Sequence, residues 1–525
     1  MKDNKITLER VSFLLLVWLV LDCAILGGGS ILKIGGISYR IFIFAFFVFC
    51  SLPLVIRNLR DLLKNKYFIF MLMWGIWLIC SSLIGIFNNN NVEIIIANLI
   101  GFASVAMVPG VLTILNTKKR IHIIMNVLAI CTVIIFIQSL IVLIVYLNDI
   151  ELYERISDYM IVAEIGGTSD INSHIVRIFL RSAPISVLGL LCTFYLTEKS
   201  EHKILKVFLI LNMALCLMSL LLTYTRSIYL GLIVGLGIML FGYYYLYRLN
   251  QCNYMKIVKI SLAVVVTFLM VLCLFNVSTK TKYLSYGIYR LTSIEYFKPV
   301  DDLNTSTEEV TKSLEESVKS EEVKNLKATN RLDEENSDNI HSEEDTENEN
   351  IKDDKKDNVT DTKKEPASES NELKNDEINK DTSLDNYENL TISEKNTASD
   401  NFREETKKEI FENIKSNLLI GKGLGTVLEC RADRDNANEY FYLDVLMKSG
   451  IVGLIIFLMP MVALLLFTLK NLTKLPKDDA KIVVTWIAGL LSVAAFSIYN
   501  PYLNGINGFM VYACTMGVCN SLENK

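Results

Sequence analysis

The chain has 525 residues, of which 51% are hydrophobic, and its mean hydropathy is +0.36. Residues 301–400 hold 31 acidic and 13 basic side chains, whereas the other 425 residues hold 26 acidic and 39 basic ones. The net charge of −5 therefore averages an apolar body with basic edges and an acidic tract, a division that excludes a set of ordinary soluble domains. No basic stretch with interleaved aromatics lies outside the membrane-flanking positions, so nucleic acid is not an expected partner.

Apolar runs recur along the chain outside the acidic tract. A hydrocarbon layer of about 30 Å needs about 20 mostly apolar residues per helical span. Twelve runs approach this length, and they predict an all-α polytopic integral membrane protein with about 12 transmembrane helices. The runs are 11–28, 39–56, 67–87, 93–115, 122–147, 178–196, 204–223, 227–247, 257–277, 451–469, 482–499 and 504–520. Nine transmembrane helices are thus expected in residues 1–277, and three more in residues 451–525.

Lysine and arginine alternate between the polar joints that separate these runs. The two ends of the sequence and every second joint together carry 21 lysines and arginines. The short joints between them carry only six. Because basic short loops stay on the cytoplasmic side, both termini are expected in the cytoplasm. The same parity places the 278–450 segment outside.

This long segment divides into three parts. Residues 301–401 are acidic, contain one aromatic residue, and cannot bury enough apolar surface to fold, so they are expected to form a disordered insertion. In residues 402–420, apolar side chains recur at helical spacing and predict an amphipathic helix on the outer membrane face. Residues 421–450 follow as a region of short motifs. The acidic residues lack the spacing of a calcium loop.

Four arginines lie on the outer side of the apolar runs, against the inside-positive bias: Arg177, Arg181, Arg226 and Arg290. Each alone is equally consistent with snorkelling toward lipid headgroups. As a set they indicate function, because a charge kept near lipid depth is costly and the guanidinium fork matches phosphate oxygens. A diphosphate at the membrane surface is one substrate that would use them.

A second group of polar residues follows the acidic tract. Arg403 precedes GKGLG, in which Gly421, Gly423 and Gly425 permit positive φ and close backbone approach. The motif lacks the spacing of a nucleotide loop, and a turn back into the membrane is the default interpretation. Glu439 comes next, and it is either an exposed loop acid or a carboxylate at the rim of a membrane cavity, where burial would make it a better base.

Few other groups suggest chemistry. The eleven cysteines lie mostly inside apolar runs, and there are four histidines, so neither a disulfide framework nor a His/Cys zinc site is expected. Asp22 lies in the first apolar run without an evident basic partner, which fits a position near the outer interface.

Three stretches resemble the O-antigen ligase and O-antigen polymerase superfamily of bacterial envelope glycosyltransferases. They are TYTRSIYLGLIVG at 223–235, Arg403 followed after 18 positions by GKGLG, and EYFYLDVLMKSGIVGL at 439–454. Thr225 stands at the family's usual serine, Glu439 where ligases usually have histidine, and Tyr440 where asparagine is common. The carboxylate is closer to the polymerase branch, and the acidic insertion is atypical.

The resemblance implies a metal-independent, GT-C-like transferase that needs no cofactor and takes an undecaprenyl-diphosphate-linked glycan as donor. Arg226, Arg290 and Arg403 would stabilise the departing diphosphate, and Glu439 would deprotonate the acceptor hydroxyl. Substrate-binding roles would fall to Arg177, Arg181, Gly421, Gly423, Gly425 and Tyr442.

The leading hypothesis is polymerisation, or ligation, of lipid-linked repeat units on the outer face of a bacterial cytoplasmic membrane, for a capsule, exopolysaccharide or O-antigen-like polymer. The expected partners are the lipid bilayer, the glycan donor, a chain-length regulator and a flippase. The alternative is a polytopic transporter or flippase without covalent chemistry, in which Arg226 and Glu439 bind a passing anion or proton. A structural scaffold is the weakest option.

Overall fold

The computed structural model describes residues 2–27, 33–34, 37–172, 175–280, 282–292, 392–431 and 439–523. Contacts divide the chain into one unit of residues 1–299 and 396–525 and a second unit of residues 300–395. The predicted disordered insertion lies outside the described residues up to position 391. Its last residues belong to a helix, because α16 begins at Ile392.

Helices build most of the described part of the first unit, and thirteen of them form its bundle. They are α1 (Lys2–Ile25), α2 (Tyr39–Arg57), α4 (Lys66–Phe87), α5 (Val92–Phe102), α6 (Val108–Ile114), α7 (Lys118–Asn148), α9 (Ala183–Lys199), α10 (Lys203–Leu222), α11 (Arg226–Arg248), α12 (Tyr254–Thr279), α17 (Phe441–Asn471), α18 (Lys477–Phe496) and α19 (Ile506–Glu523). The other helical elements are α3 (Leu59–Leu62), η1 (Ala103–Met107), α8 (Ile150–Val162), α13 (Tyr283–Thr292), α16 (Ile392–Ser416), η4 (Glu429–Arg431) and η5 (Tyr502–Asn504).

Nine helical segments of the described chain are long and apolar enough to cross a membrane. They are α2, α4, the α5–η1–α6 segment, α7, α10, α11, α12, α17 and α18, and each corresponds to a predicted run. The protein is therefore a mainly helical, multi-pass membrane protein. The other three predicted runs fall on α1, α9 and α19, so the count of twelve stays a prediction.

The described segments also contain strands, which the predicted all-α class omits. β3 (Gly166–Asn172) and β4 (Ile175–Leu180) form an antiparallel hairpin in which Ser169 pairs with Arg177. A smaller hairpin joins β1 (Lys33–Ile34) to β2 (Ile37–Ser38). The apolar run predicted to begin a transmembrane helix at residue 178 thus starts as strand β4, and α9 begins at Ala183. Hydropathy alone does not distinguish a short buried strand from the start of a helix.

Two further boundaries differ from the prediction. α17 begins at Phe441, inside the segment expected to be a loop up to residue 450. It is interrupted at Gly450, where φ is 66° and ψ is −177°. The predicted amphipathic helix at 402–420 exists as α16, which both begins and ends earlier, at Ile392 and Ser416.

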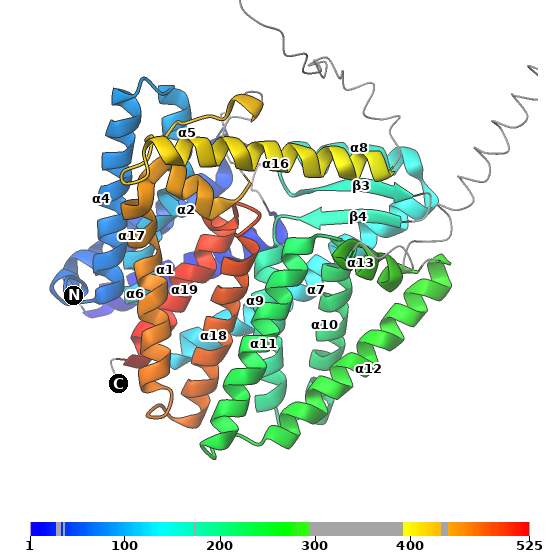
Figure 1. Cartoon of the computed structure of the whole chain (residues 1–525). Helices are drawn as coiled ribbons and strands as arrows, with labels where there is room; N and C mark the ends of the chain where they lie inside the picture. The colour runs from blue at the N-terminus through cyan, green and yellow to red at the C-terminus, as the bar shows by residue number, and fades with distance from the viewer. Residues whose placement is uncertain are drawn as a thin grey trace, which may run out of the picture. The chain divides into compact units, whose positions relative to one another are not determined.

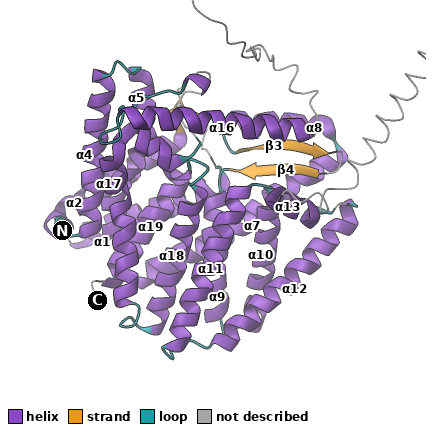
Figure 2. Ribbon diagram, viewed as in Figure 1, coloured by secondary structure: helices purple, strands orange, loops and turns teal. Residues whose placement is uncertain are grey.

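The long helices pack side by side, with α11 along α18, α4 along α17, and α7 along α9 (Figure 1). Most of α18 is buried, at 89% of its span, against 28% in α2 and in α12, so α18 is central and the other two face outward. Figure 2 shows α16 crossing over one end of the long helices, on the side where the β3–β4 hairpin and α8 lie.

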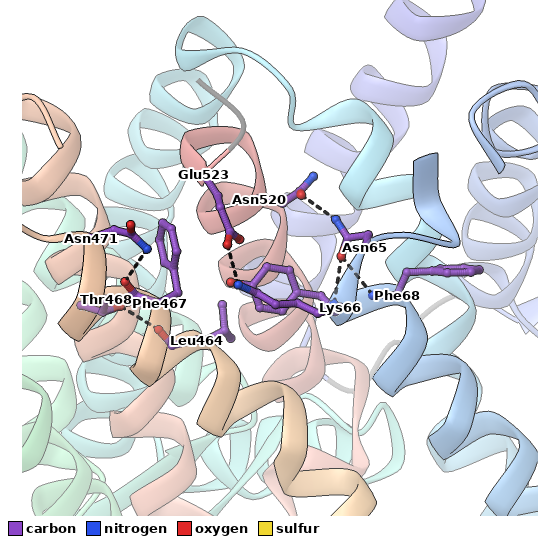
Figure 3. A network of polar contacts seen from close by, with 10 residues as sticks. Asn65, Lys66, Phe68, Leu464, Phe467, Thr468, Asn471, Asn520 and Glu523 are labelled. Carbon is purple, nitrogen blue, oxygen red and sulfur yellow. Dashed lines mark hydrogen bonds and ion pairs between the residues drawn. The ribbon is translucent and has the colours of Figure 1, made fainter. Parts of the chain in front are cut away.

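Both ends of the described chain lie at the opposite end of the bundle. Lys66, which begins α4, forms a 2.6 Å ion pair with Glu523 at the end of α19, and its ammonium lies 5.5 Å from the Phe467 ring of α17 (Figure 3). Near the start of the chain, Glu9 pairs with Arg120 of α7. We call this side the inner end and the side crossed by α16 the outer end, following the predicted orientation.

Candidate functional site

Arg403 and Glu439, two of the residues predicted to act together, form an ion pair at the outer end. Arg403 Nε donates to Glu439 Oε2 at 3.0 Å, and the two side chains are 42% and 27% exposed. Arg403 lies on α16, and Glu439 lies two residues before α17. The pair therefore sits at a surface that a molecule from outside can reach.

A small apolar cluster and a capping carboxylate hold α16 in this position. Ile410 and Ile414 are buried against Leu428 and Met447. The Glu409 carboxylate accepts hydrogen bonds from the backbone N–H groups of Glu429 and Cys430, at 2.5 and 3.1 Å. Burial favours a higher pKa for Glu409, but these hydrogen bonds and the Cys430 thiol together outweigh it and hold the pKa below its ordinary value. This end of α16 is therefore fixed by both packing and hydrogen bonds.

A second predicted group centres on the turn between α10 and α11. Arg177 of β4 reaches this turn, where Nε donates to Thr223 O and Nη2 to Thr225 Oγ1, each at 3.1 Å. Tyr224, between these threonines, has a φ of 44°, a conformation that costs free energy in a residue with a side chain. Arg226 follows as the exposed first residue of α11. Arg177 thus fixes the backbone from which Arg226 projects.

Arg290 lies on α13, and its side chain is outside the described part of the structure. Tyr286, one helical turn earlier, packs edge-on against Tyr224 with the ring centroids 4.9 Å apart. α13 therefore rests against the same α10–α11 turn that Arg177 holds.

Residues 499–507, which comprise most of the joint between α18 and α19 and the first two residues of α19, connect the two groups, and the sequence analysis gave them no role. Asn500 Nδ2 donates to Ser227 Oγ, next to Arg226. The Tyr440 N–H donates to Tyr499 O at 3.3 Å, next to Glu439. Asn507 Nδ2 donates to Arg181 O at 3.1 Å. The 499–507 segment therefore contacts the neighbours of Arg226, Arg181 and Glu439 at once.

Two other predicted substrate-binding residues have partners within the protein. Arg181 forms a 3.0 Å ion pair with Glu164, and both side chains are about half exposed, at 50% and 45%. Tyr442 donates from its hydroxyl to Ala494 O at 2.9 Å, which ties α17 to α18. Arg181 lies at the open surface, whereas the Tyr442 hydroxyl serves helix packing.

The three glycines of GKGLG have φ values of 77°, 89° and 83°, and all three are buried. The Gly423 N–H donates to Lys448 O at 3.0 Å, and the Gly425 N–H donates to Asn98 Oδ1 at 3.3 Å. The Gly421 N–H bonds to Asn417 O. These donors point at the protein instead of at an outer ligand, which favours the turn interpretation of the motif over substrate binding.

The glycine turn fits into the interruption of α17. The N–H groups of Ile451 and Val452 donate to the carbonyls of Leu418 and Leu419, and the Lys422 N–H donates to Met447 O. Backbone at membrane depth must be satisfied within the protein when a helix is broken. The segment before and within GKGLG supplies these partners, so α16, the glycine turn and α17 form one interlocked element.

The sequence analysis missed three buried ion pairs in the described segments, one of which joins Lys481 of α18 to Glu198 of α9 at 2.9 Å. Arg40 of α2 pairs with Asp22 of α1, so Asp22 has the basic partner that its sequence neighbourhood lacks. Asp444 and Lys448 pair at 3.0 Å within α17, with side chains at most 5% exposed. Their spacing of four residues on one helix is a visible signal, whereas nothing in the sequence links residues 22 and 40.

The comparisons with known proteins add no family. No protein-family model matches the sequence, and no curated protein matches it. In the described segments, no group of three or more His, Cys, Asp or Glu side chains is placed to hold a metal ion. Fold and site define the class as a multi-pass helical membrane protein whose outer end carries several arginines, two of them in ion pairs with Glu164 and Glu439.

Proposed function

We propose that this protein is a glycosyltransferase that polymerises undecaprenyl-diphosphate-linked oligosaccharide repeats at the outer face of a bacterial cytoplasmic membrane. The observation that carries the proposal is the Arg403–Glu439 ion pair, which lies at the same end of the bundle as Arg226, Arg177 and Arg181. The three motifs that resemble the O-antigen ligase and polymerase superfamily support it. Ligation of the same donor to another acceptor is its closest variant.

The reaction assigns a separate task to each charged group. The bond between C1 of the donor sugar and the diphosphate oxygen breaks, and a bond from an acceptor hydroxyl oxygen to C1 forms. Glu439 takes the hydroxyl proton, and Arg403 orients its carboxylate. Arg226 and Arg290 are assigned to the diphosphate as its negative charge develops, because fixed cations stabilise charge that appears in the transition state.

The topology follows the same proposal. All twelve apolar runs would cross the membrane in a GT-C-like arrangement, with both termini in the cytoplasm and the charged site outside. The start of α1 and the end of α19 lie at the same end of the bundle, which supports an even number of membrane crossings. The acidic insertion would then lie outside, and a chain-length regulator and a flippase would act as partners.

The test uses the purified full chain with an undecaprenyl-diphosphate-linked repeat. A ladder of lengthening glycans is expected from the wild type, and no ladder from Glu439→Gln or Arg226→Ala. Glu151→Gln, a change in an exposed pair on α8, is the matched control and should give the wild-type ladder. A single transfer to a different acceptor would favour ligation. Movement of the repeat across a bilayer without a new glycosidic bond would contradict the proposal and support a transporter.

A further inference from the structure

Strand β4 presents one arginine and one aromatic ring on the same face, and a second arginine follows the strand. Side chains alternate between the faces of a strand, so Arg177 and Phe179 share one side. Arg181 comes directly after Leu180, the last residue of β4, and its N–H donates to Ile165 O at 2.9 Å. Val176, Ile178 and Leu180, on the other side, are buried. The Arg177 guanidinium carbon lies 5.9 Å from the Phe179 ring centroid. The half-buried face of β4 therefore carries one positive charge beside a ring, and the second charge, Arg181, comes just after the end of the strand.

Tyr502 of η5 packs against this face. Its ring centroid lies 6.5 Å from that of Phe179 and 5.8 Å from that of Phe496 on α18. Its hydroxyl oxygen is buried and has no hydrogen-bond partner in the described part of the chain. Such an oxygen is costly, because folding removes its bonds to water without replacing them.

The surroundings of this hydroxyl are cationic. Burial raises the pKa of the Tyr502 phenol, and the positive charges of Arg177 and Arg181 counteract this only in part, so the phenol stays a protonated donor. The Arg181 side chain uses Nη1 for Glu164, which leaves Nε and Nη2 without a partner among the described residues. A protonated phenol beside two guanidinium groups suits an anion with several acceptor oxygens. A metal cation would be repelled there.

We propose that Tyr502 donates a hydrogen bond to a phosphate oxygen of the lipid-linked diphosphate, beside Arg177 of β4 and Arg181 just after it. This inference rests on the proposed function and makes Tyr502 a substrate-binding residue. It assigns the diphosphate to the β4 side of the outer end, where the 499–507 segment also contacts the neighbours of Arg226 and Glu439.

The test compares Tyr502→Phe with Tyr195→Phe, which removes another buried hydroxyl without a described partner, near the inner end of α9. The protein in lipid nanodiscs is titrated with undecaprenyl diphosphate, with undecaprenol, and with inorganic pyrophosphate. Tyr502→Phe should weaken undecaprenyl diphosphate binding about tenfold, the loss of one hydrogen bond to a charged group. Tyr195→Phe should leave it unchanged, and neither variant should alter undecaprenol binding.

The outcomes separate the two proposals. Equal affinity of Tyr502→Phe and wild type for undecaprenyl diphosphate would overturn the inference. A lower unfolding temperature of the variant, together with equal affinity, would indicate that the Tyr502 hydroxyl binds only a water molecule. A Tyr502 effect on pyrophosphate but not on the lipid would assign the site to a free anion and also overturn it. Selective loss of diphosphate-lipid affinity in a protein that forms no glycosidic bond would keep the binding role and reject the proposed reaction.

Discussion

Arg403 and Glu439, 36 positions apart, meet through a 3.0 Å hydrogen bond between Nε and Oε2. The arginine lies on a helix that crosses over the bundle, and the glutamate precedes a helix that enters it. Because α16 and α17 also share the glycine turn, the geometry of this pair is fixed by contacts well away from its own charges.

Replacing either member of this pair should abolish transfer without unfolding the protein. We expect Glu439→Gln and Arg403→Ala to lower the rate of glycan transfer at least about 100-fold, because general base catalysis is typically worth that much. The unfolding free energy should change by less than about 1 kcal/mol, since both side chains are partly exposed. Thermal unfolding in detergent and a transfer assay measure the two effects. Equal activity of Glu439→Gln and wild type would rule out the carboxylate as the base.

Arg177→Lys tests whether this arginine positions the α10–α11 turn. Lysine keeps the charge but cannot bond Thr223 O and Thr225 Oγ1 with the same fixed fork. We expect transfer to fall about tenfold, the equivalent of one well-placed hydrogen bond. Arg60→Lys, at an exposed position on α3, is the control. Full activity of Arg177→Lys would mean that Arg177 extends toward the lipid headgroups and does not position the turn.

Gly423→Ala should destabilise the interlocked element. A Cβ at Gly423 would lie 2.1 Å from Gly85 N, and φ there is +89°. The clash and the backbone strain together should cost about 3 kcal/mol or more. Gly75→Ala is the matched control, because a Cβ at Gly75, within α4, meets nothing within 4 Å. We expect the control to be as stable as the wild type or more so, as measured by thermal unfolding.

Glu409 makes the stability of the outer element depend on pH. Its pKa is below the ordinary value in the folded protein, so its stabilising contribution is complete above that ordinary value. The contribution is lost as the pH falls through the lower, folded-state pKa. The unfolding temperature of Glu409→Gln should therefore fall less steeply in acid than that of the wild type. Glu412→Gln, exposed on the same helix, should behave like the wild type.

Arg40→Ala should unfold the protein more readily than a double change that removes the whole pair. The single variant leaves Asp22 buried without its partner, which typically costs about 3–5 kcal/mol. Asp22→Asn combined with Arg40→Met removes both charges and should recover much of this loss. Equal unfolding temperatures for Arg40→Ala and the double variant would show that Arg40 does not stabilise the protein through its attraction to Asp22.

Hydropathy predicts the long helices because a membrane span has one dominant requirement, about 20 apolar residues in a row. The same criterion places the start of a helix inside β4, since Ile178 and Leu180 are apolar in either structure. α17 begins ten residues before its predicted span because Asp444 and Lys448 neutralise each other within it, and hydropathy counts both as polar.

The Arg403–Glu439 pair and the Arg226 turn could be proposed from the motifs, but their connection could not. It runs through Tyr499 and Asn500 of a short joint and Asn507 at the start of α19, and such residues at a joint usually indicate only a turn. The role of the GKGLG glycines is equally ambiguous in the sequence, because small residues suit a phosphate and a neighbouring helix alike.

The interruption at Gly450 has a mechanical consequence. The carbonyls of Leu418 and Leu419, just after α16, accept hydrogen bonds from the N–H groups that the broken helix α17 exposes. Lifting α16 from the bundle would therefore leave several main-chain groups without partners at the same time. A cross-link between positions 419 and 452 should therefore be compatible with full turnover.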